Sequence, residues 1–123
     1  MRAIFLIPIL LSGCASAPPI ESLMIDLRPA AISTADEHNA KQAVTASLKD
    51  PTSAKFGPVV GAVDASGVKY ACGTVNAKNS FGGYTGNEMF AVRWIGPERI
   101  EVVSIGNDFI GAHSCGRMAS RHA

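Results

Sequence analysis

The sequence predicts an α+β domain, in which one N-terminal helix packs on a small antiparallel sheet of about four strands. Three observations lead to this fold class. Apolar residues recur at helical spacing between residues 40 and 48, strand-like segments separated by turns follow from residue 55, and Cys72 and Cys115 are available for a disulfide. Roughly 110 residues follow the leader described next, enough for one domain with a single core.

The first 13 residues have the pattern of a cleavable export signal. Arg2 supplies a positive charge, and the apolar run from Ile4 to Leu11 is far shorter than the roughly 20 residues of a membrane-spanning helix. The run ends in Leu-Ser-Gly-Cys at residues 11–14, which resembles the lipobox of bacterial lipoproteins. This resemblance implies that Cys14 is acylated and becomes the first mature residue. The alternative is an ordinary secretory signal with a chance cysteine.

The lipoprotein resemblance also implies a location. Ala15 and Ser16 follow Cys14 where an aspartate would signal retention in the inner membrane, so the resemblance implies the periplasmic side of the outer membrane in a Gram-negative host. Lipid chains at Cys14 would anchor the chain without spanning the bilayer. The expected partners are thus the membrane, through the anchor, and an envelope protein or the cell wall.

Three segments are expected along the chain: a signal peptide at 1–13, an acylated cysteine with a tether at 14–32, and a periplasmic domain at 33–123. Pro18, Pro19 and Pro29 indicate the tether. Its apolar residues between Leu23 and Leu27 leave open whether this part docks on the domain.

The charge balance argues against nucleic acid as a partner. Without Arg2, ten basic and ten acidic residues remain, and the basic ones are scattered along the chain. No long-range field of one sign is left to attract a polyanion.

The helix is predicted to begin at a capping box, Thr34-Ala-Asp-Glu37, and to end at Asp50-Pro51. One apolar stripe would face the sheet and give a two-layer domain. Its members are Ala40, Ala43, Val44, Ser47 and Leu48.

Four strands are predicted after the helix. They are 56–63, with an edge or bulge at Gly57-Pro58, then 68–76, a segment carrying Phe90, Val92 and Trp94, and 99–105. Short connections between them favour an antiparallel meander.

Cys72 and Cys115 are expected to form a disulfide, because an exported domain meets an oxidising compartment and Cys14 is used for the anchor. The bond would tie the second strand to segment 107–118, which is predicted to contain a short helix. The rival reading is a nucleophilic Cys115 assisted by His113, two positions away.

The sequence predicts no catalytic site, no metal site and no cofactor. His38, His113 and His122 lack the usual ligand spacing. Acids for glycoside chemistry would have to come from Glu88, Glu98 and Glu101, which are expected to be solvated.

The stretch CGTVNAKNSFGGYTG, residues 72–86, is expected to end the second strand and to form a long hairpin connection. Together with LKDPTSAKF at 48–56, it resembles a pattern in small exported or lipid-anchored bacterial and phage-encoded proteins, most of which are described as uncharacterised. The resemblance covers residues 44–92 and implies a shared exported domain, with no substrate or catalytic residue.

We predict that this connection binds a partner, since Asn, Ser, Gly, Lys and Tyr suit adaptable contacts. The candidate contact residues are Asn76, Lys78, Asn79, Tyr84 and Asn87. In the alternative, Phe81 and Tyr84 fold back over the sheet edge while the asparagines bond the backbone of their own loop.

The predicted function is a non-catalytic binding or envelope-structural module. One alternative is an inhibitor that inserts the same loop into an envelope or cell-wall enzyme. The other is a cell-wall hydrolase.

Overall fold

The structure is a computed structural model that describes residues 25–106 and 113–118. The predicted signal peptide, Cys14, most of the tether, residues 107–112 and His122 lie outside the described residues.

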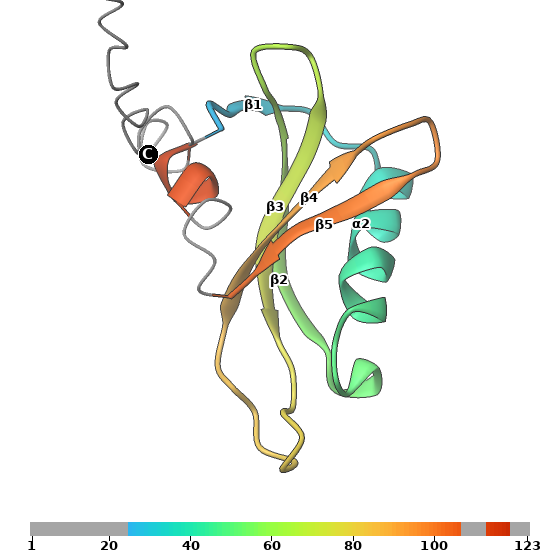
Figure 1. The fold of residues 1–123 in the computed structure, drawn as a ribbon, viewed down its shortest axis with the longest axis vertical. Coiled ribbons are helices and arrows are strands. Elements are labelled where there is room, and N and C mark those ends of the chain that lie inside the picture. The colour runs from blue at the N-terminus through green and yellow to red at the C-terminus, as the bar shows by residue number, and fades with distance from the viewer. Residues whose placement is uncertain (1–24, 107–112, 119–123) are drawn as a thin grey trace, which may run out of the picture.

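The described chain forms an α+β domain, as the sequence predicts (Figure 1). Its sheet is an antiparallel meander in which each strand pairs with the next along the chain. The strands are β1 (Arg28–Ala30), β2 (Lys55–Val63), β3 (Lys69–Asn76), β4 (Glu88–Trp94) and β5 (Ile100–Ile105). The sheet therefore has five strands rather than the four expected, and the shift in register between Phe56 and Val59 confirms the bulge expected at Gly57-Pro58.

The additional strand, β1, lies in the segment that the sequence assigns to the tether. It pairs with the last residues of β2, from Arg28 opposite Val63 to Ala30 opposite Gly61. Gly61 allows this contact, because a Cβ there would lie 2.5 Å from the carbonyl oxygen of Ala30. Leu27, just before the strand, is buried. The folded unit thus includes residues before 33, and the apolar end of the expected tether docks on the domain.

Helix α2 (Thr34–Ala46) begins one residue earlier than the predicted capping box implies. Ser33 is the N-cap and accepts a hydrogen bond from the backbone N–H of Asp36 at 3.0 Å, so the prediction of Thr34 as the cap is wrong. The helix also ends at Ala46, short of Asp50-Pro51. Of the predicted apolar stripe, Ala40 and Val44 are fully buried, whereas Ser47 is exposed.

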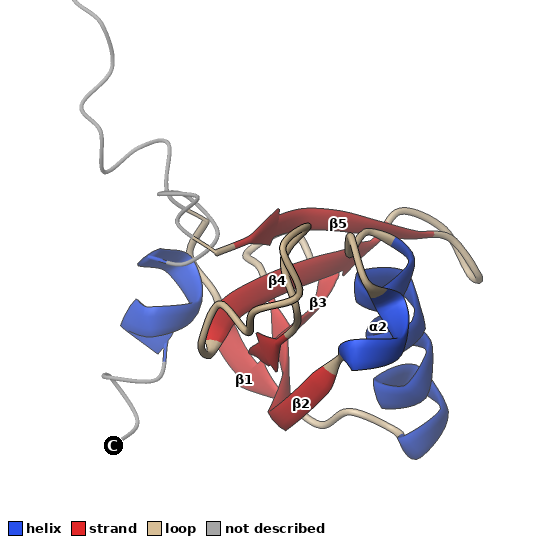
Figure 2. Ribbon diagram, turned by 90° about the horizontal axis from the view of Figure 1, so that it is seen from below, coloured by secondary structure: helices blue, strands red, loops and turns tan. Residues whose placement is uncertain are grey.

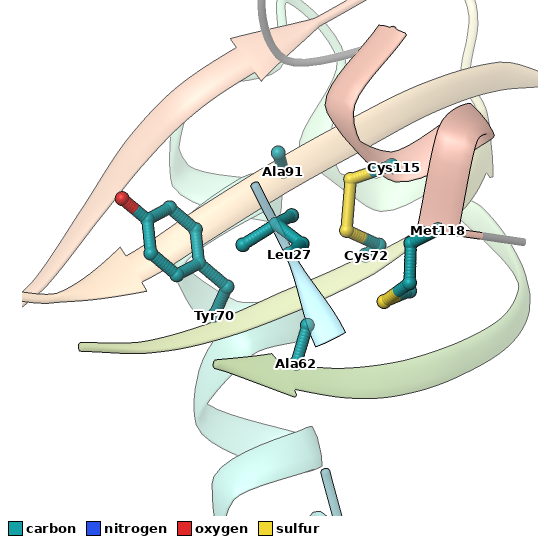
Figure 3. Close-up of a cluster of buried hydrophobic side chains, with 7 residues drawn as sticks. All are labelled: Leu27, Ala62, Tyr70, Cys72, Ala91, Cys115 and Met118. Atoms are coloured by element: carbon teal, nitrogen blue, oxygen red, sulfur yellow. A yellow bond between two sulfur atoms is a disulfide. The ribbon is translucent and has the colours of Figure 1, made fainter. Parts of the chain in front are cut away.

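Both faces of the sheet carry a cluster of buried residues, so the domain has more layers than the expected two (Figure 2). Helix α2 covers one face, where the cluster consists of Ala40, Val44, Ala71, Val75, Phe90, Val92 and Trp94. A short helix at residues 113–118 covers the other, where the cluster consists of Leu27, Ala62, Tyr70, Cys72, Ala91, Cys115 and Met118 (Figure 3).

The expected disulfide is present and holds the short helix on the sheet. Cys72 in β3 bonds to Cys115, 43 positions later, with the two Cα atoms 5.9 Å apart. The backbone N–H of Ile25 also donates to the hydroxyl of Ser114 at 3.1 Å. The first described residue and the short helix are therefore joined on the same face. Among the described residues, no helix is long and apolar enough to cross a membrane.

Candidate functional site

The predicted loop is an extension of the β3–β4 hairpin beyond the sheet. Its two arms pair at Lys78 and Tyr84, and the backbone N–H of Thr85 donates to the carbonyl of Ala77 at 3.2 Å. Only residues 79–83 form the tip. The hairpin extends from the end of the sheet opposite to β1, at the lower end of Figure 1.

The tip is fixed by hydrogen bonds to Asn79. Its side-chain oxygen accepts from the backbone N–H groups of Phe81 at 2.9 Å and Gly83 at 3.2 Å. Its backbone N–H donates to the carbonyl of Gly83 at 2.8 Å, and its carbonyl accepts from Gly82, whose φ of 80° suits glycine. Asn76 acts similarly at the base, where its side-chain oxygen accepts from the N–H of Gly86 at 3.1 Å.

These bonds change the roles expected for two candidate residues. Asn76 and Asn79 bond the backbone of their own loop, as the alternative reading expected, so their side-chain oxygens shape the hairpin. Asn87 is exposed beside the first residue of β4 and remains a candidate contact. Lys78 and Tyr84 face each other across the two arms.

Phe81 is a candidate contact residue that the sequence does not predict. It does not fold back over the sheet edge, because it is 97% exposed at the tip of the hairpin. The other exposed large hydrophobic residues of the described chain are about half as exposed, with Ile95 at 51%, Val60 at 48% and Tyr84 at 42%. The tip of a fixed loop therefore presents one almost fully exposed aromatic ring to solvent.

Two lysines contact the ring of Tyr84. The Nζ of Lys55, at the start of β2, lies 4.7 Å from the ring centroid, and the Nζ of Lys78 lies 5.6 Å from it. The backbone N–H of Lys78 also donates to the buried hydroxyl of Ser53 at 2.8 Å, in a 3-10 turn (Pro51–Ser53). The hairpin is thus attached to the segment that leads into β2.

The α2 side of the sheet is hollowed near the base of the hairpin and near the β4–β5 connection. One hollow, of about 250 Å³, lies at the base of the hairpin between Leu48, Lys78 and Ile105. Another, of about 540 Å³, lies between α2 and the β4–β5 connection and is lined by Gln42, Trp94 and Glu98, among others.

The structure bears on two of the catalytic readings weighed from the sequence. The sulfur of Cys115 is bonded to Cys72, so the reading of Cys115 as a thiol nucleophile is wrong. Glu88 is the first residue of β4. Glu101 lies in β5, opposite Arg93 near the other end of β4, and forms an ion pair with Arg93. Within residues 25–106 and 113–118, no group of three or more His, Cys, Asp or Glu side chains is placed to hold a metal ion.

Comparisons with known proteins give no further assignment. Neither a protein-family model, nor a curated protein, nor a solved structure matches this chain. No activity, ligand or partner is therefore carried over from another protein.

Proposed function

We propose that this chain is an exported, lipid-anchored envelope protein whose folded domain is a non-catalytic binding module. Its β3–β4 hairpin would dock into a partner protein of the cell envelope. The observation that carries this proposal is the 97% exposure of Phe81 at the tip of a loop that Asn79 holds in place.

An exposed ring on a fixed loop suits binding for two energetic reasons. Burying a phenylalanine side chain in a partner pocket stabilises a complex by roughly 1.5–3 kcal/mol. A loop already held by its own hydrogen bonds loses little conformational freedom on binding, so the entropic cost of ordering it offsets less of this favourable energy. Aromatic anchors of this kind dominate the energetics of many interfaces.

The export and anchoring part of the proposal rests on sequence and on the disulfide. Leu-Ser-Gly-Cys follows an apolar run at the N-terminus, and the bond between Cys72 and Cys115 suits an oxidising compartment. The described chain enters the sheet at β1, at the end opposite to the hairpin (Figure 1). Phe81 would accordingly point away from the side on which the tether joins the domain.

The same geometry supports inhibition of an envelope or cell-wall enzyme as a second candidate. A fixed loop that projects one ring beyond the sheet is the shape that an inserted inhibitor loop needs. The two candidates differ in the partner, which is an enzyme in one case and a non-enzymatic envelope protein in the other.

Site-specific photo-crosslinking tests the proposal. The full-length chain carries p-benzoylphenylalanine in place of Phe81, is exported in its host and is irradiated in intact cells. We expect a discrete covalent adduct with an envelope protein. The matched control places the probe at Ile95, which is 51% exposed on the β4–β5 connection. Absence of an adduct from position 81, or identical adducts from both positions, would contradict the proposed binding surface.

The anchor has a separate test. Metabolic labelling with a fatty-acid analogue should mark the wild-type protein and not the Cys14→Ser variant. Equal labelling of both would contradict the lipid attachment.

A further inference from the structure

We infer that Lys55, Lys78 and Tyr84 form an anion-binding site on the side of the hairpin, and that this site takes carboxylates of an acidic segment on the partner protein. This inference rests on the proposed function, because the hairpin that carries Phe81 also carries two of these three residues.

The site is assembled from the first residue of β2 and from two paired residues of the hairpin. Lys78 and Tyr84 lie opposite each other on the arms of the hairpin, and Lys55 begins β2, where it is paired with Asn76 at the end of β3. Both ammonium groups lie near one ring, at 4.7 Å for Lys55 and 5.6 Å for Lys78 from its centroid. Pairing in the hairpin and in the sheet therefore gathers two positive charges around Tyr84.

The other lysine–aromatic contacts of the described chain are complemented by a carboxylate. The Nζ of Lys69 lies 4.6 Å from the ring of Trp94 and also 2.7 Å from a carboxylate oxygen of Asp36. The Nζ of Lys41 lies 5.9 Å from the ring of Phe56 and 2.9 Å from a carboxylate oxygen of Glu37.

The two lysines at Tyr84 have no such complement. Lys41, Lys69 and Arg93 make ion pairs, whereas neither Lys55 nor Lys78 takes part in one with another described residue. Both ammonium groups carry a positive charge, and a carboxylate from outside would interact favourably with them. We therefore assign the carboxylate that would pair with Lys55 and Lys78 to the partner protein.

The ligand is better assigned to a protein than to a bilayer. Attraction to an anionic membrane surface takes clusters of about four to eight basic residues, whereas two lysines gather here. Phe81 is a single apolar anchor, which fits one pocket. An apolar pocket with an acidic rim would receive Phe81 and the lysines together, and the charges would set orientation and association rate.

Binding of a fluorescent hexaglutamate peptide to the full-length protein tests this site, followed by anisotropy at low and at physiological salt. The test variant is Lys55→Gln/Lys78→Gln. The matched control, Arg28→Gln/Arg99→Gln, removes the same charge from two exposed arginines elsewhere. We expect the test variant to lose about tenfold or more in affinity, as the loss of charged contacts implies, and the control to change by less than about twofold.

Equal losses in both variants would overturn the inference, because binding would then follow net charge alone. The protein could instead bind inorganic phosphate or phosphatidylglycerol vesicles through Lys55 and Lys78 and fail to bind the peptide. This outcome would overturn the assignment to carboxylates. The crosslinking result separates the two proposals. An adduct from position 81 that persists in Lys55→Gln/Lys78→Gln overturns the anion site alone, whereas peptide binding without an adduct from position 81 overturns the proposed docking of Phe81.

Discussion

Phe90 fills the centre of the α2-covered face because the residue opposite it has no side chain. It is fully buried and is paired across the sheet with Gly73. A Cβ at Gly73 would lie 2.7 Å from Cζ of Phe90 and 3.0 Å from the carbonyl oxygen of Pro58. Phe56 then meets the ring edge-on, with the ring centroids 5.8 Å apart. One glycine thus sets the position of an aromatic pair.

Gly73→Ala should therefore destabilise the domain. The added methyl forces Phe90 or the backbone of β2 to move, and overpacking of this kind costs about 1–3 kcal/mol. Urea denaturation followed by circular dichroism measures the change. Gly116→Ala is the matched control, because a Cβ at that helical position would meet nothing within 4 Å beyond its chain neighbours and the backbone of its own helix. A stability loss for Gly73→Ala no greater than for Gly116→Ala would contradict the packing role of this glycine.

At single residues, the sequence predicts the disulfide correctly and the helix cap to within one position. Cys72 and Cys115 are the cysteines left once Cys14 is assigned to the anchor, and they are bonded. The helix cap was misplaced by one position, because Ser33 and Thr34 are both good caps and only the backbone angles decide between them. The sequence does not predict Phe81 as a candidate contact, since phenylalanine is usually buried and the exposure of Phe81 depends on the hairpin leaving the sheet.

At the scale of elements, the hairpin combines a fixed tip with an exposed ring. Asn79 supplies most of the order at the tip, through two bonds to its side chain and two to its backbone. The tip projects beyond the sheet, so its order should be separable from the stability of the whole domain.

Asn79→Ala should loosen the tip without unfolding the domain. The variant loses the acceptor for the N–H groups of Phe81 and Gly83, both in exposed positions, so the free energy of unfolding should fall by less than about 1 kcal/mol. Hydrogen exchange at residues 80–83 should become faster, and crosslinking from position 81 weaker. Asn39→Ala, at an exposed asparagine of α2 outside the hairpin, serves as control. Unchanged exchange at the tip would contradict the role assigned to Asn79.

Periodicity predicted the longer elements and failed at the shortest one. Helix α2 and strands β2 to β5 carry patterns that local sequence displays, and all were found near the expected positions. β1 is three residues long, includes Pro29 and depends on Gly61 to approach β2, so no local pattern marks it. The predicted end of α2 at Asp50-Pro51 is also too late. The helix ends at Ala46, with Ser47 as its C-cap, before the proline restricts the backbone.

At the scale of the whole molecule, the two faces of the sheet are covered in different ways. Helix α2 follows directly from β1 and presents Ala40 and Val44 to the sheet. The opposite face is covered by residues from both ends of the described chain, namely Leu27 and the helix at 113–118. A helix this short is not stable by itself, so the Cys72–Cys115 bond and packing must hold it.

The double variant Cys72→Ser/Cys115→Ser should consequently be much less stable than the wild type. With Cys115 lying 43 positions after Cys72, the chain-entropy relation gives a loss of roughly 4 kcal/mol, a large part of the about 5–15 kcal/mol that holds a typical domain together. Denaturation of the variant, and of the wild type under dithiothreitol, measures the loss, and two equal stabilities in oxidised and reduced protein would contradict it.

Hydrogen exchange in the variant should rise first at residues 25–27 and 113–118, where Cys115 and Met118 meet Leu27 (Figure 3). The hairpin tip, at the other end of the strands and held by Asn79, should keep its protection under conditions where most molecules remain folded. Loss of the disulfide would then uncover the face beside β1 before it affects the surface proposed to bind the partner.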